Sequence, residues 1–193
     1  MQTSQTHLTT ARSLLYRSSQ GASTPTGAAV ALRDFSLNLR YGFRGPSAQA
    51  YLQDADLSVP SQPNCALATP GGQQVLRLSN TEFWVIHPES TQTQPLLDTA
   101  DGEGCYSLYN RDSHAWLVLS GCEISSVMAK LCAVDLRTEH FALGAIAQTS
   151  VARVNAIVVH HELEGESVFS LFSDSASASY LWSALQDAMG EFK

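Results

Sequence analysis

Charged side chains are scarce in this chain. Asp, Glu, Lys and Arg make up 15% of its 193 residues, whereas a typical globular domain carries about 25%. Acidic residues outnumber basic ones by 18 to 11, which gives a net charge of −7. A nucleic-acid-binding protein needs a basic surface to displace phosphate counterions, so this balance argues against one. Because 44% of the residues are hydrophobic, a core can form, and the charge-poor surface suggests cover by partner proteins.

The chain also lacks paired cysteines and long apolar runs. Its four cysteines form no C-x-x-C pair and match no zinc or redox spacing: Cys65, Cys105, Cys122 and Cys132. We therefore expect buried thiols in a reducing, cytoplasmic compartment. No apolar run reaches the roughly 18 residues of a membrane helix. A basic amphipathic stretch and a secretory h-region are missing too, so we expect no contact with a membrane.

Acidic residues are absent from the stretch Met1–Arg33, which is rich in Ser, Thr, Gln, Gly and Ala. Such a segment buries little apolar area and is expected to be disordered by itself. An organelle transit peptide has a similar composition, but a sustained amphipathic stripe is missing here. We favour a flexible arm over residues 1–30 that becomes ordered against a partner, with Leu14, Leu15 and Tyr16 as its anchor. Residues 31–193 then form one domain.

A strand, a glycine turn and a helix are predicted early in this domain. Hydrophobic residues alternate from Leu37 to Phe43, as in a half-buried strand. Gly45-Pro46 breaks the strand, and Pro46 suits the first position of a helix. The apolar residues that follow recur at helical spacing: Ala48, Tyr51, Leu52 and Ala55.

The same pattern returns 76 positions later, which indicates an internal repeat. Gly121 takes the position of Gly45, and a second apolar helical face follows it: Ile124, Val127, Met128 and Leu131. The same offset places Val75–Leu78 on Val151–Val154. The sequence therefore predicts two pseudo-repeats, at about 34–110 and 111–190.

Each repeat is expected to run strand, helix, strand, strand, with closing strands at 83–86 and 168–172. A helix should end each repeat. The second of these helices carries an apolar stripe from Tyr180 to Met189, and Gly190 occupies the position of its C-terminal cap. Duplicated units with helices on one face of each sheet predict an α+β fold.

Motifs that would identify an active site are missing. There is no G-x-S-x-G elbow, no P-loop, no H-E-x-x-H and no dinucleotide fingerprint. His160-His161-Glu162 is the most conspicuous polar cluster, but in a strand only His160 and Glu162 share a face. Because zinc takes three or four ligands, we interpret this cluster as a strand end before a turn at Leu163–Glu166.

Cys122 is the candidate nucleophile, since it follows the glycine turn at a helix N-terminus, where a thiol pKa falls. A base would have to come from His114 or His140, and neither is predicted to be near it. Asp34 and Asp135 suit turns or helix caps.

The three tryptophans lie in apolar runs and are expected in the core or in an interface: Trp84, Trp116 and Trp182. We therefore predict no catalytic residue, no cofactor-binding residue and no metal-binding residue on this chain.

Several short motifs resemble the folate-binding aminomethyltransferase superfamily, which includes the T-protein of glycine cleavage. Asp34-Phe35-Ser36 and Gly45–Leu52 match its D-x-S…G-P-x-A-x-x-x-L signature. Within the superfamily, the chain is most similar to gamma subunits of heterotetrameric sarcosine oxidase, over roughly residues 31–192. The further matching segments are Leu76–Phe83, Leu119–Gly121, Leu131–Leu136, Ala147–Val151 and Tyr180–Trp182.

This resemblance implies a folate-binding-domain fold built from duplicated units. It also implies a place in a complex with alpha, beta and delta subunits that oxidises sarcosine. In such a complex FAD, FMN, NAD and tetrahydrofolate belong to the large alpha and beta subunits and zinc to delta. The gamma subunit then holds no cofactor.

One segment departs from the active members of the superfamily. Active T-proteins carry G-G-x-x-D-D, whose acid activates the folate nitrogen. The matching Gly71–Leu76 contains two glutamines and no acid. An amide cannot take up a proton as a general base. We therefore expect a non-catalytic gamma subunit with a structural or assembly role in sarcosine oxidation.

Two other functions stay open at this point. A stand-alone folate-binding or one-carbon-transfer protein would need a deep pocket between the halves, with Glu82 or Glu123 as the carboxylate for the pterin ring. A stand-alone cytosolic adaptor would need only an interface, and the sequence does not separate it from a subunit.

Overall fold

The computed structural model describes residues 29–88, 100–102 and 104–192. The expected N-terminal arm and its anchor at Leu14, Leu15 and Tyr16 lie outside the described residues. The acid-free stretch ends in a strand, β1 (Ala31–Asp34), which pairs with residues 117–120. Residues 31–33, which follow the predicted arm, therefore belong to a sheet, and Leu32 is buried in the core.

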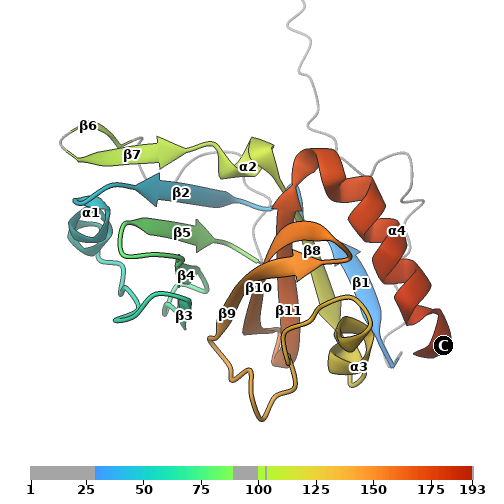
Figure 1. The fold of residues 1–193 in the computed structure, drawn as a ribbon. Coiled ribbons are helices and arrows are strands. Elements are labelled where there is room, and N and C mark those ends of the chain that lie inside the picture. The colour runs from blue at the N-terminus through green and yellow to red at the C-terminus, as the bar shows by residue number, and fades with distance from the viewer. Residues whose placement is uncertain (1–28, 89–99, 103, 193) are drawn as a thin grey trace, which may run out of the picture.

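The described residues form two antiparallel sheets (Figure 1). Sheet A contains, in spatial order, β1, β8 (His114–Ser120), β11 (Glu166–Asp174), β10 (Val154–Leu163) and β9 (Ile146–Val151). Sheet B contains β3 (Cys65–Ala68), β4 (Gln74–Arg77), β5 (Glu82–Ile86), β2 (Arg40–Arg44), β7 (Cys105–Leu108) and β6 (Asp101–Gly102). The predicted closing strands at 83–86 and 168–172 are confirmed as parts of β5 and β11.

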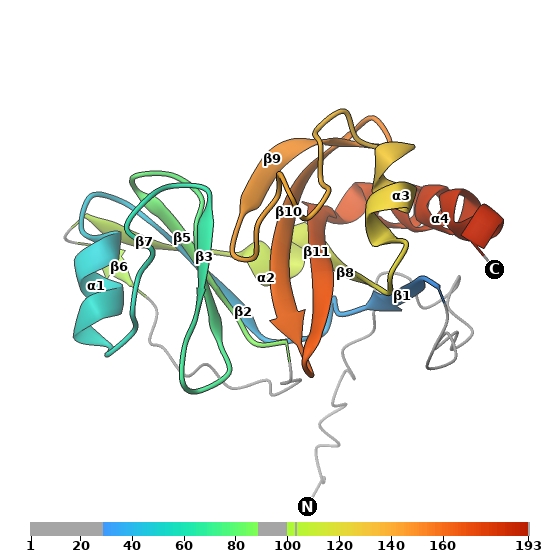
Figure 2. The ribbon, with the colours of Figure 1, turned by 90° about the horizontal axis from the view of Figure 1, so that it is seen from below.

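Helices cover the outer faces of the two sheets, as Figures 1 and 2 show. On sheet B lies α1 (Ala48–Asp54); on sheet A lie α3 (Ile124–Ala129) and α4 (Ala178–Met189). The short α2 (Asn110–Ser113) joins β7 to β8, and 3-10 turns η1 (Ser175–Ser177) and η2 (Gly190–Phe192) flank α4. The mixed, strand-rich architecture agrees with the α+β prediction.

Three hydrophobic clusters hold these layers together. Between the sheets, Trp84 of β5 packs with Trp116 and Phe172 of sheet A. The outer cluster of sheet B buries Leu52 of α1, and that of sheet A buries Trp182 of α4. Full burial of a side chain of this size stabilises the fold by about 1.5–3 kcal/mol. The core position predicted for all three tryptophans is confirmed, with exposures of 0–3%.

The two sheets share one strand order. In sheet B, β2 lies between β5 and β7; in sheet A, β8 lies between β11 and β1. In the chain, however, β1 leads into β2 of sheet B, and β7 leads towards β8 of sheet A. Sheet A therefore takes β1, and sheet B takes the β6–β7 pair, from the segment that leads into the other sheet. We call this arrangement the strand exchange.

The glycine turns after β2 and β8 have matching geometry. Gly45 has φ +140° and Gly121 has φ +112°. A Cβ atom on Gly45 would lie 2.0 Å from the carbonyl oxygen of Gly104, and one on Gly121 would lie 2.5 Å from that of Ala29. In both turns the chain passes so close to a neighbouring carbonyl that only glycine fits.

The third correspondence of the predicted repeat does not hold. Val75–Leu78 lies in and just after β4, whereas Val151–Val154 forms the turn between β9 and β10. The cause is a difference in loop length. The connection from α3 to β9 spans residues 130–145, but the one from α1 to β3 spans only 55–64. A constant offset of 76 therefore cannot extend beyond the helices.

Two helix-terminus predictions also need correction. Ser47 is the N-cap of α1, so Pro46 precedes the helix and is not its first residue. Gly190 is the C-cap of α4 as predicted, but its φ of −55° is right-handed and the chain continues into η2. Within the described part of the chain, no helix has the length and apolar character needed to cross a membrane.

Candidate functional site

The Asp34-Phe35-Ser36 motif forms a corner between β1 and β2. The Asp34 carboxylate accepts a hydrogen bond from the Ser36 amide at 2.9 Å, which closes a turn. The Ser36 hydroxyl accepts one from the Trp116 amide at 3.1 Å, and the Phe35 amide donates to the Trp116 carbonyl. The predicted role of Asp34 in a turn is confirmed, so this part of the signature ties the chain to sheet A.

Arg40, at the start of β2, holds the same corner from inside. Its guanidinium is 2% exposed and donates to backbone carbonyls of five residues: Ser36, Asn38, Asn110, Arg111 and His114. Burial, and to a smaller extent the nearby Arg111, lower the pKa of Arg40 to about 10. The group still carries its charge at neutral pH. The sequence analysis missed this residue, because one arginine in an alternating strand gives no signal.

The two histidines of β10 have separate structural partners. His160 is bound to the Phe141 carbonyl and to the Ser167 hydroxyl, both at 2.7 Å, and stacks on the Phe141 ring. His161 is bound to the Ser170 hydroxyl at 2.7 Å. The structural interpretation of the cluster agrees with these contacts. No group of three or more potential metal ligands occurs among the described residues.

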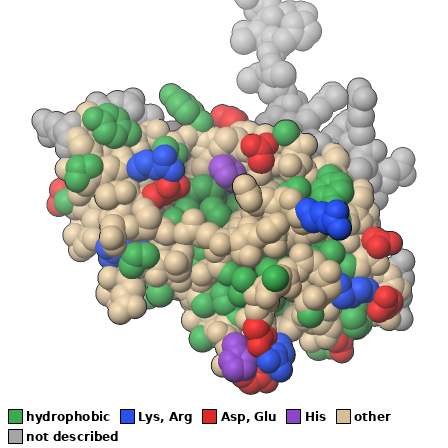
Figure 3. Space-filling view, in the orientation of Figure 1, with side chains coloured by type: hydrophobic (Ala, Val, Ile, Leu, Met, Phe, Trp, Pro, Cys, Tyr) green, Lys and Arg blue, Asp and Glu red, His purple; other side chains and the backbone are tan. Residues whose placement is uncertain are grey.

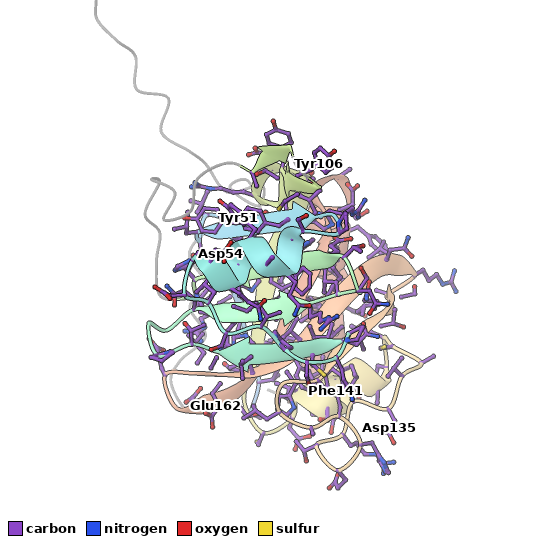
Figure 4. All side chains as sticks on the ribbon, turned by 90° about the vertical axis from the view of Figure 1, so that its left-hand side faces the viewer. Tyr51, Asp54, Tyr106, Asp135, Phe141 and Glu162 are labelled. Carbon is purple, nitrogen blue, oxygen red and sulfur yellow. The ribbon has the colours of Figure 1, made fainter. Side chains whose placement is uncertain are left out.

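The neighbouring carboxylate, Glu162, is exposed near the end of β10, apart from the loop that carries Asp135 (Figure 4). The Asp135 carboxylate accepts from the Arg137 amide and guanidinium, which hold the pKa of Asp135 well below its usual range. The turn role predicted for Asp135 is confirmed.

Neither of the two candidate bases, His114 and His140, lies beside the Cys122 thiol. Its thiol is exposed and contacts the Ala29 carbonyl at 3.7 Å. His114 begins β8, and Cys122 lies two residues beyond the end of that strand. A strand rises about 3.3 Å per residue, so the two side chains are separated by roughly 20 Å. His140 is bound instead to Asp135 at 3.8 Å. This arrangement does not activate a thiol.

The segment that departs from the active superfamily members is a hairpin turn. Gly71 and Gly72 lie between β3 and β4, and the Thr69 hydroxyl donates to the Gln73 side chain across the turn. Gln74 is buried in β4, opposite Ala68. Both glutamines serve the hairpin, and no carboxylate stands in this turn.

The described surface contains hollows, of which two are relevant to a site. The first, of about 800 Å³, opens at the end of sheet A next to sheet B, and its lining includes His114, Gln148, Asn155, Ile157, Phe172 and Asp174. Figure 3 shows a depression on this face in which hydrophobic side chains gather beside a histidine and charged groups. Of these six residues, only His114 was a candidate catalytic residue from the sequence.

The second hollow, of about 490 Å³, lies beside α1. Its lining includes Tyr51 and Asp54, which Figure 4 shows on the exposed side of that helix. Glu82 and Glu123, the two carboxylates named for a pterin ring, line neither hollow. Glu82 instead accepts from the Trp84 indole at 3.2 Å and pairs with Arg44.

Comparison with known proteins identifies one family. Residues 47–191 match the model of the family described as sarcosine oxidase, gamma subunit. A chain of heterotetrameric sarcosine oxidase from Corynebacterium sp. U-96, solved in complex with pyrrole 2-carboxylate, is similar with a TM-score of 0.74 and 20% identity. The match covers 94% of this chain and 96% of that one.

The aminomethyltransferase T of the glycine cleavage system from Bartonella henselae has a similar fold, with a TM-score of 0.53 and 17% identity. That match covers 84% of this chain but only 46% of the transferase. No curated protein sequence matches the chain. At these identities the two solved structures establish the likeness of fold alone.

Proposed function

The chain belongs to the sarcosine oxidase gamma subunit family, and we propose that it is a non-catalytic, structural gamma subunit of a multisubunit, flavin-dependent sarcosine oxidase. The observation that carries this proposal is that the signature residues have structural roles. Asp34 and Ser36 form a backbone corner, and Gly45 makes room for a carbonyl. A catalytic relative would be expected to carry acidic residues that act on folate in this segment. The hairpin at Gly71–Leu76 contains none.

We propose that alpha, beta and delta subunits are the partners, and that FAD, FMN, NAD, tetrahydrofolate and zinc reside on them. Four large side chains support cover by other proteins, because more than half of each is exposed: Tyr106, Tyr109, Leu143 and Tyr180. Four free cysteines support a reducing, cytoplasmic setting.

We also propose that the two sheets descend from duplicated units. The support is the shared strand order and the paired turns at Gly45 and Gly121. Ser47 and Glu123, again 76 positions apart, donate equivalent amide hydrogen bonds to Gly104 and Ala29, each at 3.0 Å. The strand exchange then joins both units into one domain.

Co-purification tests the subunit role. We expect a tagged copy, expressed with the genes of its operon, to bring down a flavin-containing subunit, and sarcosine turnover to be lost when this chain is omitted. Omission followed by full turnover would contradict the proposal. A partner-free monomer that binds tetrahydrofolate in calorimetry would favour the stand-alone folate-binding alternative instead.

A further inference from the structure

The hollow at the end of sheet A is built from two rows of side chains on one face. Strand pairing places Asp174 opposite His114, and Phe172 opposite Ile157. Directly opposed residues of antiparallel strands point to the same side of the sheet, with Cβ atoms about 5 Å apart. Asn155 follows in the outer row, two positions before Ile157 on β10. The outer row is polar, and the inner row is apolar as far as Gln148, which pairs with Ile157.

Two polar side chains of this hollow, Gln148 and Asp174, favour hydrogen-bond donors as ligands. The Gln148 amide nitrogen donates to the Asn64 side chain and to the Leu78 carbonyl, both at 2.7 Å, so the amide oxygen is left as an acceptor. One Asp174 oxygen accepts from the Ala176 amide at 2.8 Å, and the carboxylate has capacity for further donors. Neither side chain offers a donor to the hollow.

The apolar floor includes Ile157, which is partly exposed beside the fully buried Phe172. The partly exposed His114 ring meets the Trp84 indole at 4.9 Å, and Phe172 meets the same indole edge-on at 5.4 Å. An aliphatic side chain accepts the methylene stem of a long basic side chain, and a partly exposed ring offers its face to the planar head.

Asp174 is the one charged side chain among the described lining residues of the hollow. None of its described lining residues is Lys or Arg. The Arg40 guanidinium donates to the His114 carbonyl and to other backbone carbonyls, and the Glu82 carboxylate is paired with Arg44. Burial first, and Arg40 second, lower the pKa of His114, so its ring is neutral at pH 7. Asp174 therefore supplies the charge that faces a ligand.

We propose that this hollow receives an arginine side chain from a neighbouring subunit, with the guanidinium on Asp174 and the stem on Ile157. The proposal rests on the subunit role. Arginine fits better than lysine because its planar head stacks on rings and binds several acceptors at once. The scarcity of basic residues on this chain, with a net charge of −7, also suits a basic partner surface.

The test compares Asp174→Asn and Asp174→Lys with Asp187→Asn, an exposed carboxylate of α4 that does not line the hollow. Each tagged chain is titrated onto the complex prepared without it, at low and at high salt. We expect Asp174→Asn to raise the dissociation constant about tenfold or more with a weaker salt dependence, and Asp174→Lys to prevent association. The control should stay within about twofold. Wild-type affinity of both Asp174 variants would overturn the proposal.

A second measurement separates this proposal from the subunit role. N-acetyl-argininamide is titrated into the isolated chain while the NMR signals of His114 and Asn155 are followed. We expect saturable shifts that Asp174→Asn removes and the control keeps. If the wild-type chain binds no subunit, the subunit role fails, and this titration still decides whether the hollow takes a guanidinium. Unchanged signals would refute that binding.

Discussion

Three buried side chains form a hydrogen-bonded chain beneath the hollow. The Trp116 indole donates to the Ser170 hydroxyl at 2.8 Å, and that hydroxyl is bound to His161 Nε2 at 2.7 Å. The Glu162 carbonyl, 3.0 Å from His161 Nδ1, can only accept, so in the neutral ring Nδ1 carries the proton and Nε2 accepts from the Ser170 hydroxyl. Burial lowers the pKa of His161 to about 4.

Acid should therefore weaken the fold through His161. Because its folded pKa lies below the unfolded value of about 6.5, the unfolded state binds more protons between pH 6.5 and 4. Over that window we expect the free energy of unfolding to fall by about 3 kcal/mol from this group. Urea unfolding of the His161→Gln variant at several pH values should show a flatter profile. The exposed His140→Gln control should keep the wild-type slope, and equal slopes in all three chains would contradict the assignment.

Local sequence patterns predicted the environment of some individual residues but not of others. The alternation of a strand was enough to separate His160 from His161, and the structure agrees. The hollow was not predictable, because Gln148, Asn155 and Asp174 come from three strands that only the sheet register brings together. Arg40 was missed for a similar reason, since its acceptors lie up to 74 positions away.

Among the elements, turns were predicted best when they depend on local geometry. The turn at Leu163–Glu166 joins β10 to β11, and its central residues, Glu164 and Gly165, have φ values of 53° and 79°. Both positive angles are typical of a tight hairpin turn. The turn at Gly45 has a different origin. The carbonyl of Gly104, the residue before β7, occupies the space that a side chain at position 45 would need.

Alanine at these two glycines should separate the two effects. We expect Gly45→Ala to cost more than about 3 kcal/mol, because its Cβ would overlap the Gly104 carbonyl in addition to the positive φ. Gly165→Ala, where no atom lies within 4 Å of the new Cβ, should cost about 1 kcal/mol from φ alone. Urea denaturation midpoints measure both. A Gly45→Ala chain as stable as Gly165→Ala would show that the close approach is not a constraint.

Across the whole molecule, the strand exchange makes the two sheets interdependent. Strand β1 contributes Leu32 to the core of sheet A, and β7 contributes Cys105 to the core of sheet B. Each sheet would lose this core residue without the strand. Both strands are short, but they close the sides of β8 and β2.

We therefore expect that neither half of the chain folds alone. Two fragments, residues 1–94 and 95–193, should each lack near-UV circular dichroism when purified separately and should regain it when mixed. The association follows because each fragment holds a strand of the other's sheet, and each then buries its apolar face. An independently folded fragment with protected amides would refute this interdependence.

The sequence by itself determined the local elements: the closing strands, the helices after Gly45 and Gly121, and the turn roles of Asp34 and Asp135. These follow from hydrophobic period and backbone sterics, which act over a few residues. It also carried the family resemblance. Only the tertiary structure decided that residues 31–34 form a strand, how the sheets exchange strands, and where Arg40 and Asp174 act. Those features depend on contacts between distant segments, whose free energy appears only once the sheets pair.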